Sequence, residues 1–236
     1  MLDHVLLWVD VAATAADTFL LARILQLRLQ RTYLFIALAC LLSVFFDGVQ
    51  LWLGLNSEAS DRVFLYSRFL YAFVYPMVAW DVFEEMKRQI SQTRRVALGR
   101  LVSGLFFAAL FGFILSLFMG GDEGQPRVSF TLALILWAGS CAATLGFFWT
   151  VRKALKAQQL TRPHNTFVWM TFYVLTLIGE IVACFGGVAA SFANPTVTGI
   201  FNLVLLTYGF GITVWCAAML KRIPSDVSTE ASAGVS

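Results

Sequence analysis

Charged residues are scarce in this chain, and their scarcity argues against a soluble globular protein. Of the 236 residues only 13% are charged, whereas 59% are hydrophobic, and the mean hydropathy is +0.76. A soluble domain of this length needs considerably more charge to cover its surface. The basic residues lie in short loops between apolar runs rather than in one patch. The composition therefore argues against nucleic-acid binding and indicates a polytopic protein whose main partner is the lipid bilayer.

Residues that bind metals and haem are also few. The two histidines, His4 and His164, fall at opposite ends of the expected membrane domain and so cannot ligate one iron. The sequence contains no CxxC or Cys/His cluster, and all four cysteines fall within apolar runs: Cys40, Cys141, Cys184 and Cys216. We therefore expect no metal site, no cofactor and no disulfide framework. Because a Ser/His pair and clustered metal ligands are both missing, we do not expect an enzyme.

Two further absences narrow the class of membrane protein. A heptahelical retinal protein needs a lysine deep in its last span, and every lysine here falls in a loop or at a helix end: Lys87, Lys153, Lys156 and Lys221. Covalently bound retinal is therefore excluded. The amino terminus lacks the basic segment and cleavage site of a secretory signal, and Asp10 and Asp17 interrupt its apolar run. We interpret that run as the first membrane span.

Long apolar runs are what the chain has in abundance. A membrane-spanning helix needs about 20 mostly apolar residues, and seven runs approach or exceed that length: 5–27, 33–54, 63–85, 99–119, 129–151, 166–189 and 197–219. The predicted fold is all-α, a seven-transmembrane-helix bundle over residues 1–222. The polar segment 223–236 is predicted to be a disordered cytoplasmic tail.

The distribution of basic residues predicts the orientation of the bundle. Fourteen of the seventeen lysines and arginines fall in the loops and helix ends of one side, whereas Arg62 and Arg127 fall on the other side and Arg68 within a span. By the positive-inside rule the amino terminus lies outside and the carboxy terminus in the cytoplasm. The expected location is a cell inner or plasma membrane.

The small residues of the fourth run and the acidic residues of the third run each predict a local feature of the structure. In the fourth run Gly104, Ala108, Gly112 and Ser116 follow at four-residue spacing, which predicts close packing against a neighbouring helix. At the end of the third run, three acidic residues stand beside lysine and arginine, and we expect them to form a solvated, salt-bridged helix end: Asp81, Glu84 and Glu85.

Ionisable residues within the spans are the candidate functional residues, because such residues are costly in a membrane and face protein or a wet cavity. At about 1.5 Å per residue, Asp10, Asp47, Arg68 and Glu180 fall at similar depth, roughly 8 to 14 Å below the outer surface. Asp17 falls deeper. The sequence predicts a ligand-binding pocket in the outer half of the bundle, lined by six residues: Asp10, Asp47, Arg68, Tyr71, Tyr75 and Glu180.

This constellation has two interpretations. In the functional one, a single arginine faces several carboxylates, so some carboxylates are protonated or hold a cation. The site then binds a small cationic ligand or carries protons. In the structural one, Arg68 pairs with Asp47 or Asp10, and the remaining carboxyls hydrogen-bond across helices.

We predict a heptahelical sensor, receptor-like or small-molecule-binding module, with a basic inner surface for a membrane or cytoplasmic protein partner. The alternatives are a small proton-coupled transporter and an accessory subunit of a larger membrane complex.

Overall fold

The computed structural model describes residues 2–54, 57–86, 98–107, 109–110, 125–157, 163–191 and 195–223. Within these ranges the chain is helical apart from short connections, as the sequence predicts. Six helices are long and apolar enough to cross a membrane. They are α1 (Leu2–Gln26), α2 (Leu34–Leu53), α3 (Glu58–Met86), α5 (Gln125–Ala157), α6 (His164–Ser191) and α7 (Pro195–Met219). A short 3-10 helix, η1 (Leu29–Arg31), precedes α2.

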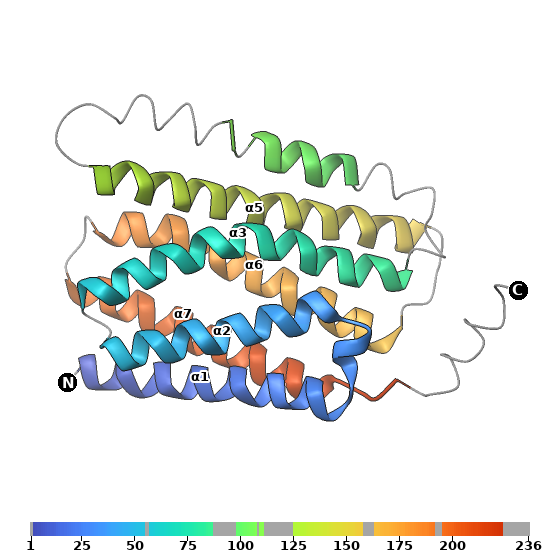
Figure 1. The fold of residues 1–236 in the computed structure, drawn as a ribbon, viewed down its shortest axis with the longest axis horizontal. Coiled ribbons are helices and arrows are strands. Elements are labelled where there is room, and N and C mark those ends of the chain that lie inside the picture. The colour runs from blue at the N-terminus through green and yellow to red at the C-terminus, as the bar shows by residue number, and fades with distance from the viewer. Residues whose placement is uncertain are drawn as a thin grey trace, which may run out of the picture.

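The six long helices form a closed ring. Each contacts the next in the order α1, α2, α3, α5, α6, α7, and α7 packs back against α1. The helices lie roughly side by side along the long axis of the molecule (Figure 1). We call the end where α1 begins the amino end and the end where α7 finishes the carboxy end. The orientation of these ends across a membrane stays a prediction.

The helix of the fourth predicted span lies outside this ring. The structure describes it over Leu98–Phe107, beyond α5 in Figure 1, and the rest of the predicted segment 99–119 falls outside the described residues apart from 109–110. At Gly104 an added Cβ would lie 2.7 Å from the Cβ of Ala143 on α5. Arg100 donates a hydrogen bond of 2.9 Å to Thr150 on the same helix. The close packing predicted at Gly104 is confirmed, whereas Ala108, Gly112 and Ser116 lie outside the described side chains.

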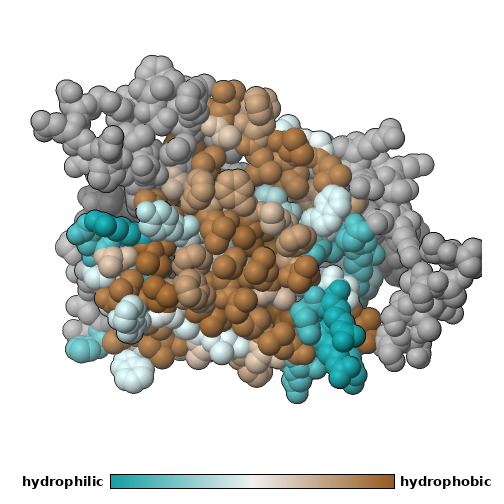
Figure 2. Space-filling model, viewed as in Figure 1, coloured by the Kyte–Doolittle hydropathy of each residue, from teal (hydrophilic) through white to brown (hydrophobic). Residues whose placement is uncertain are grey.

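The outer surface of the ring is apolar between its two ends. Large side chains such as Phe45, Phe185 and Val204 are more than half exposed. Figure 2 shows hydrophobic residues across the middle of one face and hydrophilic residues toward both ends. Because exposing such a large contiguous apolar surface to water is unfavourable, the pattern fits helices surrounded by lipid. A multi-pass membrane protein is thus supported.

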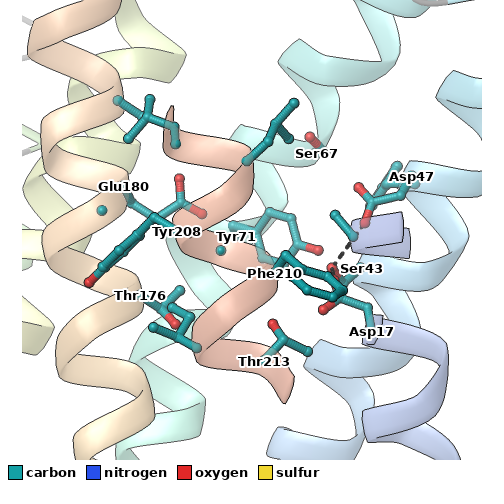
Figure 3. A pocket seen from close by; sticks show the side chains of 18 of the residues that line it. Asp17, Ser43, Asp47, Ser67, Tyr71, Thr176, Glu180, Tyr208, Phe210 and Thr213 are labelled. Atoms are coloured by element: carbon teal, nitrogen blue, oxygen red, sulfur yellow. Dashed lines mark hydrogen bonds between the residues drawn. The ribbon is translucent and has the colours of Figure 1, made fainter. Parts of the chain in front are cut away.

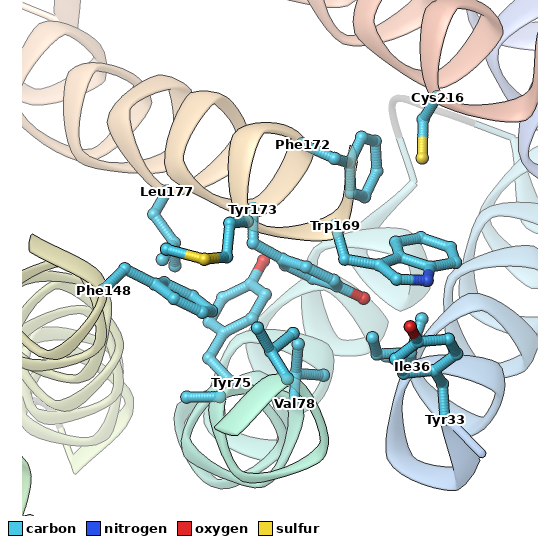
Figure 4. Close-up of a cluster of buried hydrophobic side chains, with 14 of the residues drawn as sticks. Tyr33, Ile36, Tyr75, Val78, Phe148, Trp169, Phe172, Tyr173, Leu177 and Cys216 are labelled. Atoms are coloured by element: carbon cyan, nitrogen blue, oxygen red, sulfur yellow. The ribbon is translucent and has the colours of Figure 1, made fainter. Parts of the chain in front are cut away.

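The interior of the ring is packed unevenly along its axis. Fully buried side chains gather toward the carboxy end, where Ile36, Val78 and Trp169 have no exposed surface. Aromatic rings from α2 and α6 meet here, with the centroids of Tyr33 and Trp169 6.0 Å apart (Figure 4). This part of the core is closely packed, and the cavity of the bundle lies nearer the amino end.

Asp81 and Glu85, at the carboxy end, make interhelical contacts instead of facing water, whereas Glu84 is exposed as predicted. Asp81 is only 7% exposed, and its carboxylate accepts a 3.0 Å hydrogen bond from the backbone N–H of Ile36. It therefore caps the first turn of α2, where backbone donors have no partner within the helix. Glu85 accepts hydrogen bonds from the hydroxyls of Tyr33 and Thr166. The predicted solvated helix end is wrong for Asp81, because capping α2 from a neighbouring helix requires its burial.

Burial and the neighbouring Glu85 carboxylate raise the pKa of the Tyr33 hydroxyl above its ordinary value. Tyr33 therefore remains a hydrogen-bond donor, and the contact joins α2 to α3.

A proline within α3 leaves one backbone acceptor free, and α5 supplies its partner. Pro76 lacks an N–H, so the carbonyl of Ala72 four residues earlier loses its helical hydrogen bond. The Ser140 hydroxyl, buried on α5, donates to that carbonyl at 2.5 Å. In a membrane, where lipid offers no substitute donor, this contact fixes α3 against α5. The same stretch of α3 carries Tyr71 and Tyr75.

Candidate functional site

A cavity of about 830 Å³ lies inside the ring, toward the amino end. Side chains of all six long helices line it, from Gln50 and Asn202 near the amino end down to Leu20, Phe172 and Thr213. The structure brings all six residues of the predicted pocket to this one cavity: Asp10, Asp47, Arg68, Tyr71, Tyr75 and Glu180. That they bind a ligand stays a prediction. Figure 3 shows how several of these side chains point inward from different helices.

An ion pair between α3 and α6 crosses the cavity wall. Nη1 of Arg68 lies 3.1 Å from Oε1 and 3.0 Å from Oε2 of Glu180. The Tyr75 hydroxyl donates to Oε1 of the same carboxylate at 2.9 Å. The sequence-based alternative that paired Arg68 with Asp47 or Asp10 is wrong, because α3 and α6 contact each other directly on the inner side of α5 and bring Glu180 within reach of Arg68.

Aromatic rings enclose the arginine on two sides. The guanidinium carbon of Arg68 lies 4.5 Å from the ring centroid of Phe64 and 4.5 Å from that of Trp137. Such cation–π contacts stabilise a cation that has lost water, by about 2 kcal/mol when desolvated. The Arg68 side chain is thus held by one carboxylate and two rings, which makes it part of the frame of the cavity.

Two tyrosines form part of the cavity wall between this ion pair and α2. Tyr71 and Tyr75 stack with their ring centroids 5.5 Å apart and an interplanar angle of 18°. Phe46 of α2 lies 6.4 Å from Tyr71, centroid to centroid. The spacing of four residues along α3 places both tyrosines on one helical face. This wall offers π faces to any cation inside the cavity.

A second polar group joins α1 to α2. The Ser43 hydroxyl lies 2.6 Å from Oδ2 of Asp17 and 3.3 Å from Oδ2 of Asp47 (Figure 3). Thr213 of α7 lies beside Asp17 in the same view. All four residues line the cavity. Asp17, which the sequence placed deeper than Asp47, contacts Ser43, and Ser43 stands about one turn of α2 farther from the amino end than Asp47.

The charges around the cavity do not balance. Among the described residues that line it, four are carboxylic acids and one is basic: Asp10, Asp17, Asp47, Glu180 and Arg68. Because Arg68 is already bound to Glu180, the three aspartates are left without a basic partner on the described cavity wall. Half-buried carboxylates within a membrane-spanning bundle are costly without a counter-charge, so they hold protons or a cation.

The described part of the chain offers no group of three or more His, Cys, Asp or Glu side chains arranged around a metal ion. No protein-family model matches the chain, and no curated protein or solved structure resembles it. The geometry of the cavity is therefore the basis for a functional assignment.

Several residues of the site are not among the six that the sequence analysis assigned to the pocket. Ser43 stands four residues before Asp47 on one helical face, and this spacing was the available signal for it. Phe64 and Trp137 gave no signal, because an aromatic residue in a membrane span is usually packing. Trp137 is 2% exposed, and its indole N–H has no hydrogen-bond partner among the described residues. An unpaired buried donor costs about 1–3 kcal/mol, and an acceptor entering beside it would remove that cost.

Proposed function

We propose that this protein is a membrane-embedded binding module for a small organic cation, acting as a sensor or receptor and not as an enzyme. The observation that carries the proposal is the charge of the cavity wall. Three aspartates face a volume of about 830 Å³, while the lining arginine is already neutralised by Glu180. A cation entering the cavity would meet carboxylates on α1 and α2 and π faces on α3.

The uneven packing favours binding over passage. The lining of the cavity reaches Leu20, Tyr75 and Phe172, and beyond these residues Val78 and Trp169 are fully buried. A ligand that enters from the amino end therefore meets a solid core before the carboxy end. By the positive-inside rule the amino end faces outward, so the module would sense an external compound. Its basic inner loops would contact a protein partner inside the cell.

Ligand-dependent stability in detergent tests this proposal. The probe is benzyltrimethylammonium, a permanent cation with an aromatic ring, and its neutral isostere is neopentylbenzene. We expect the cation to raise the melting temperature of the protein and the isostere to leave it unchanged. Asp47→Asn should strongly reduce the shift, whereas Asp61→Asn, at an exposed position of α3, should retain it.

Native mass spectrometry of protein extracted gently from its own membrane provides the second test. A bound small molecule that is lost in Asp47→Asn supports the binding module. A stoichiometric set of other polypeptides without a small molecule would assign the chain to a larger complex and overturn the proposal. Proton or solute flux in liposomes would instead identify a carrier.

A further inference from the structure

The contacts of Ser43 allow the proton on the cavity wall to be located. A serine hydroxyl has one hydrogen to donate and lone pairs to accept. Ser43 lies within hydrogen-bonding distance of two carboxyl oxygens, one on Asp17 and one on Asp47. It can donate to only one of them. The other oxygen, unless it carries a hydrogen of its own, would face the serine lone pairs in repulsion.

The two distances indicate which carboxyl is ionised. Hydrogen bonds from a hydroxyl to a charged carboxylate are typically about 2.5–2.7 Å long, shorter than neutral ones. The 2.6 Å contact to Asp17 falls in this range, whereas the 3.3 Å contact to Asp47 does not. Ser43 therefore donates its hydrogen to an ionised Asp17, and the more distant Asp47 receives no hydrogen from it. Because Asp47 also has no basic partner on the described cavity wall, it is the carboxyl expected to hold a proton of its own.

We propose that Asp47 is the protonated acid of the Asp17–Ser43–Asp47 group, and that a cation binding in the cavity displaces this proton to water. The proposal rests on the proposed function, since it assigns the binding event of the same cavity. Cation binding is then linked to the release of one proton. When Asp47 is protonated, the site binds cations poorly. When Asp47 loses its proton, two neighbouring carboxylates, Asp17 and Asp47, are available to a single positive ligand.

The surrounding groups favour this assignment. Asp10 on α1 is a further acid whose negative charge would oppose the ionisation of Asp47. Arg68 on α3 would favour ionisation, but Glu180 on α6 already binds it. Six more titratable side chains line the cavity from α2, α3, α6 and α7, and they are neutral at physiological pH in their ordinary state: Cys40, Tyr71, Tyr75, Tyr173, Cys184 and Tyr208. The hydroxyl of Tyr208 donates to the backbone carbonyl of Leu175.

Infrared spectroscopy tests for the proton without any ligand. The spectrum of wild type at neutral pH, minus that of Asp47→Asn, should contain the C=O stretching band of a protonated carboxylic acid. The same difference for the exposed control Asp61→Asn should lack it. An asparagine amide has the size of a neutral carboxylic acid and carries no charge, so Asp47→Asn is expected to fold. Absence of the band in the first difference would overturn the proposal, whether or not the protein binds a cation.

Calorimetry then tests the displacement. Titrations with benzyltrimethylammonium in two buffers of different ionisation enthalpy count the protons released, and the probe itself does not titrate. We expect close to one proton per bound cation, and an affinity that rises up to tenfold per pH unit until Asp47 is ionised. Asp47→Asn should bind weakly and independently of pH. Binding without proton release refutes the linkage but leaves the proposed function intact, whereas absence of binding refutes both.

Discussion

The Arg68–Glu180 ion pair allows a direct test of how this bundle holds charge in its interior. The perturbation is Glu180→Gln, which removes the negative charge while keeping the shape of the side chain and an acceptor for Tyr75. Arg68 would then be left with two aromatic rings and a neutral amide. Since an unpaired cation at membrane depth is costly, the variant should be less stable than wild type.

The structure sets the size of the effect. Removing one partner of a fully buried pair costs about 3–5 kcal/mol. The side chains of Arg68 and Glu180 are 21% and 18% exposed, so water screens part of the charge, and we expect about 2–4 kcal/mol. The double variant Arg68→Met with Glu180→Gln removes both charges at similar volume. It should regain about half of the loss or more, because no unpaired charge remains.

Equilibrium unfolding in mixed micelles, followed by circular dichroism, measures these free energies. Glu58→Gln is the matched control, because it breaks a second Arg–Glu pair whose side chains are 71% and 82% exposed. That variant should not differ measurably from wild type. Two results would refute the interpretation of Arg68 and Glu180 as a desolvated ion pair. One is a Glu180→Gln variant as stable as this control. The other is a double variant whose loss of unfolding free energy equals the sum of the losses in Arg68→Met and Glu180→Gln.

Three further predictions concern the packing of the ring. Ser140→Ala should lower the unfolding free energy by about 1–3 kcal/mol, because the backbone carbonyl of Ala72 then loses its hydrogen-bond donor. Adding Pro76→Ala should restore most of the loss, because the new N–H at position 76 can donate to that carbonyl within the helix. Gly104→Ala should weaken the packing of its helix on α5, seen as faster hydrogen exchange there, whereas Gly99→Ala, with open space around it, should not. The raised pKa of Tyr33 stabilises the fold below about pH 10, the ordinary tyrosine value, and this stabilisation is lost as pH rises toward the folded pKa. Tyr33→Phe should therefore flatten the fall of melting temperature above that pH, and an unchanged slope would contradict the buried position of its hydroxyl.

The amino-acid sequence by itself determined the helices and the level of the polar residues along them. Hydropathy and the 1.5 Å rise per residue are local properties, so counting from the span ends sufficed to align Asp10, Asp47, Arg68 and Glu180. All four do line one cavity. The helix bounds differ from the predicted ones mainly where polar turns extend a helix beyond its apolar run, as at Glu58 and Gln125.

Only the tertiary structure decided which of these residues are partners. The direction in which a side chain points around the ring depends on how each helix is rotated and which helices face each other, and neither follows from the spacing along one helix. For this reason Arg68 binds Glu180 rather than an aspartate, and Asp81 caps α2 rather than facing water. The position of Leu98–Phe107 outside the ring is likewise a consequence of packing, since an apolar sequence is equally suited to a lipid-facing and a central helix.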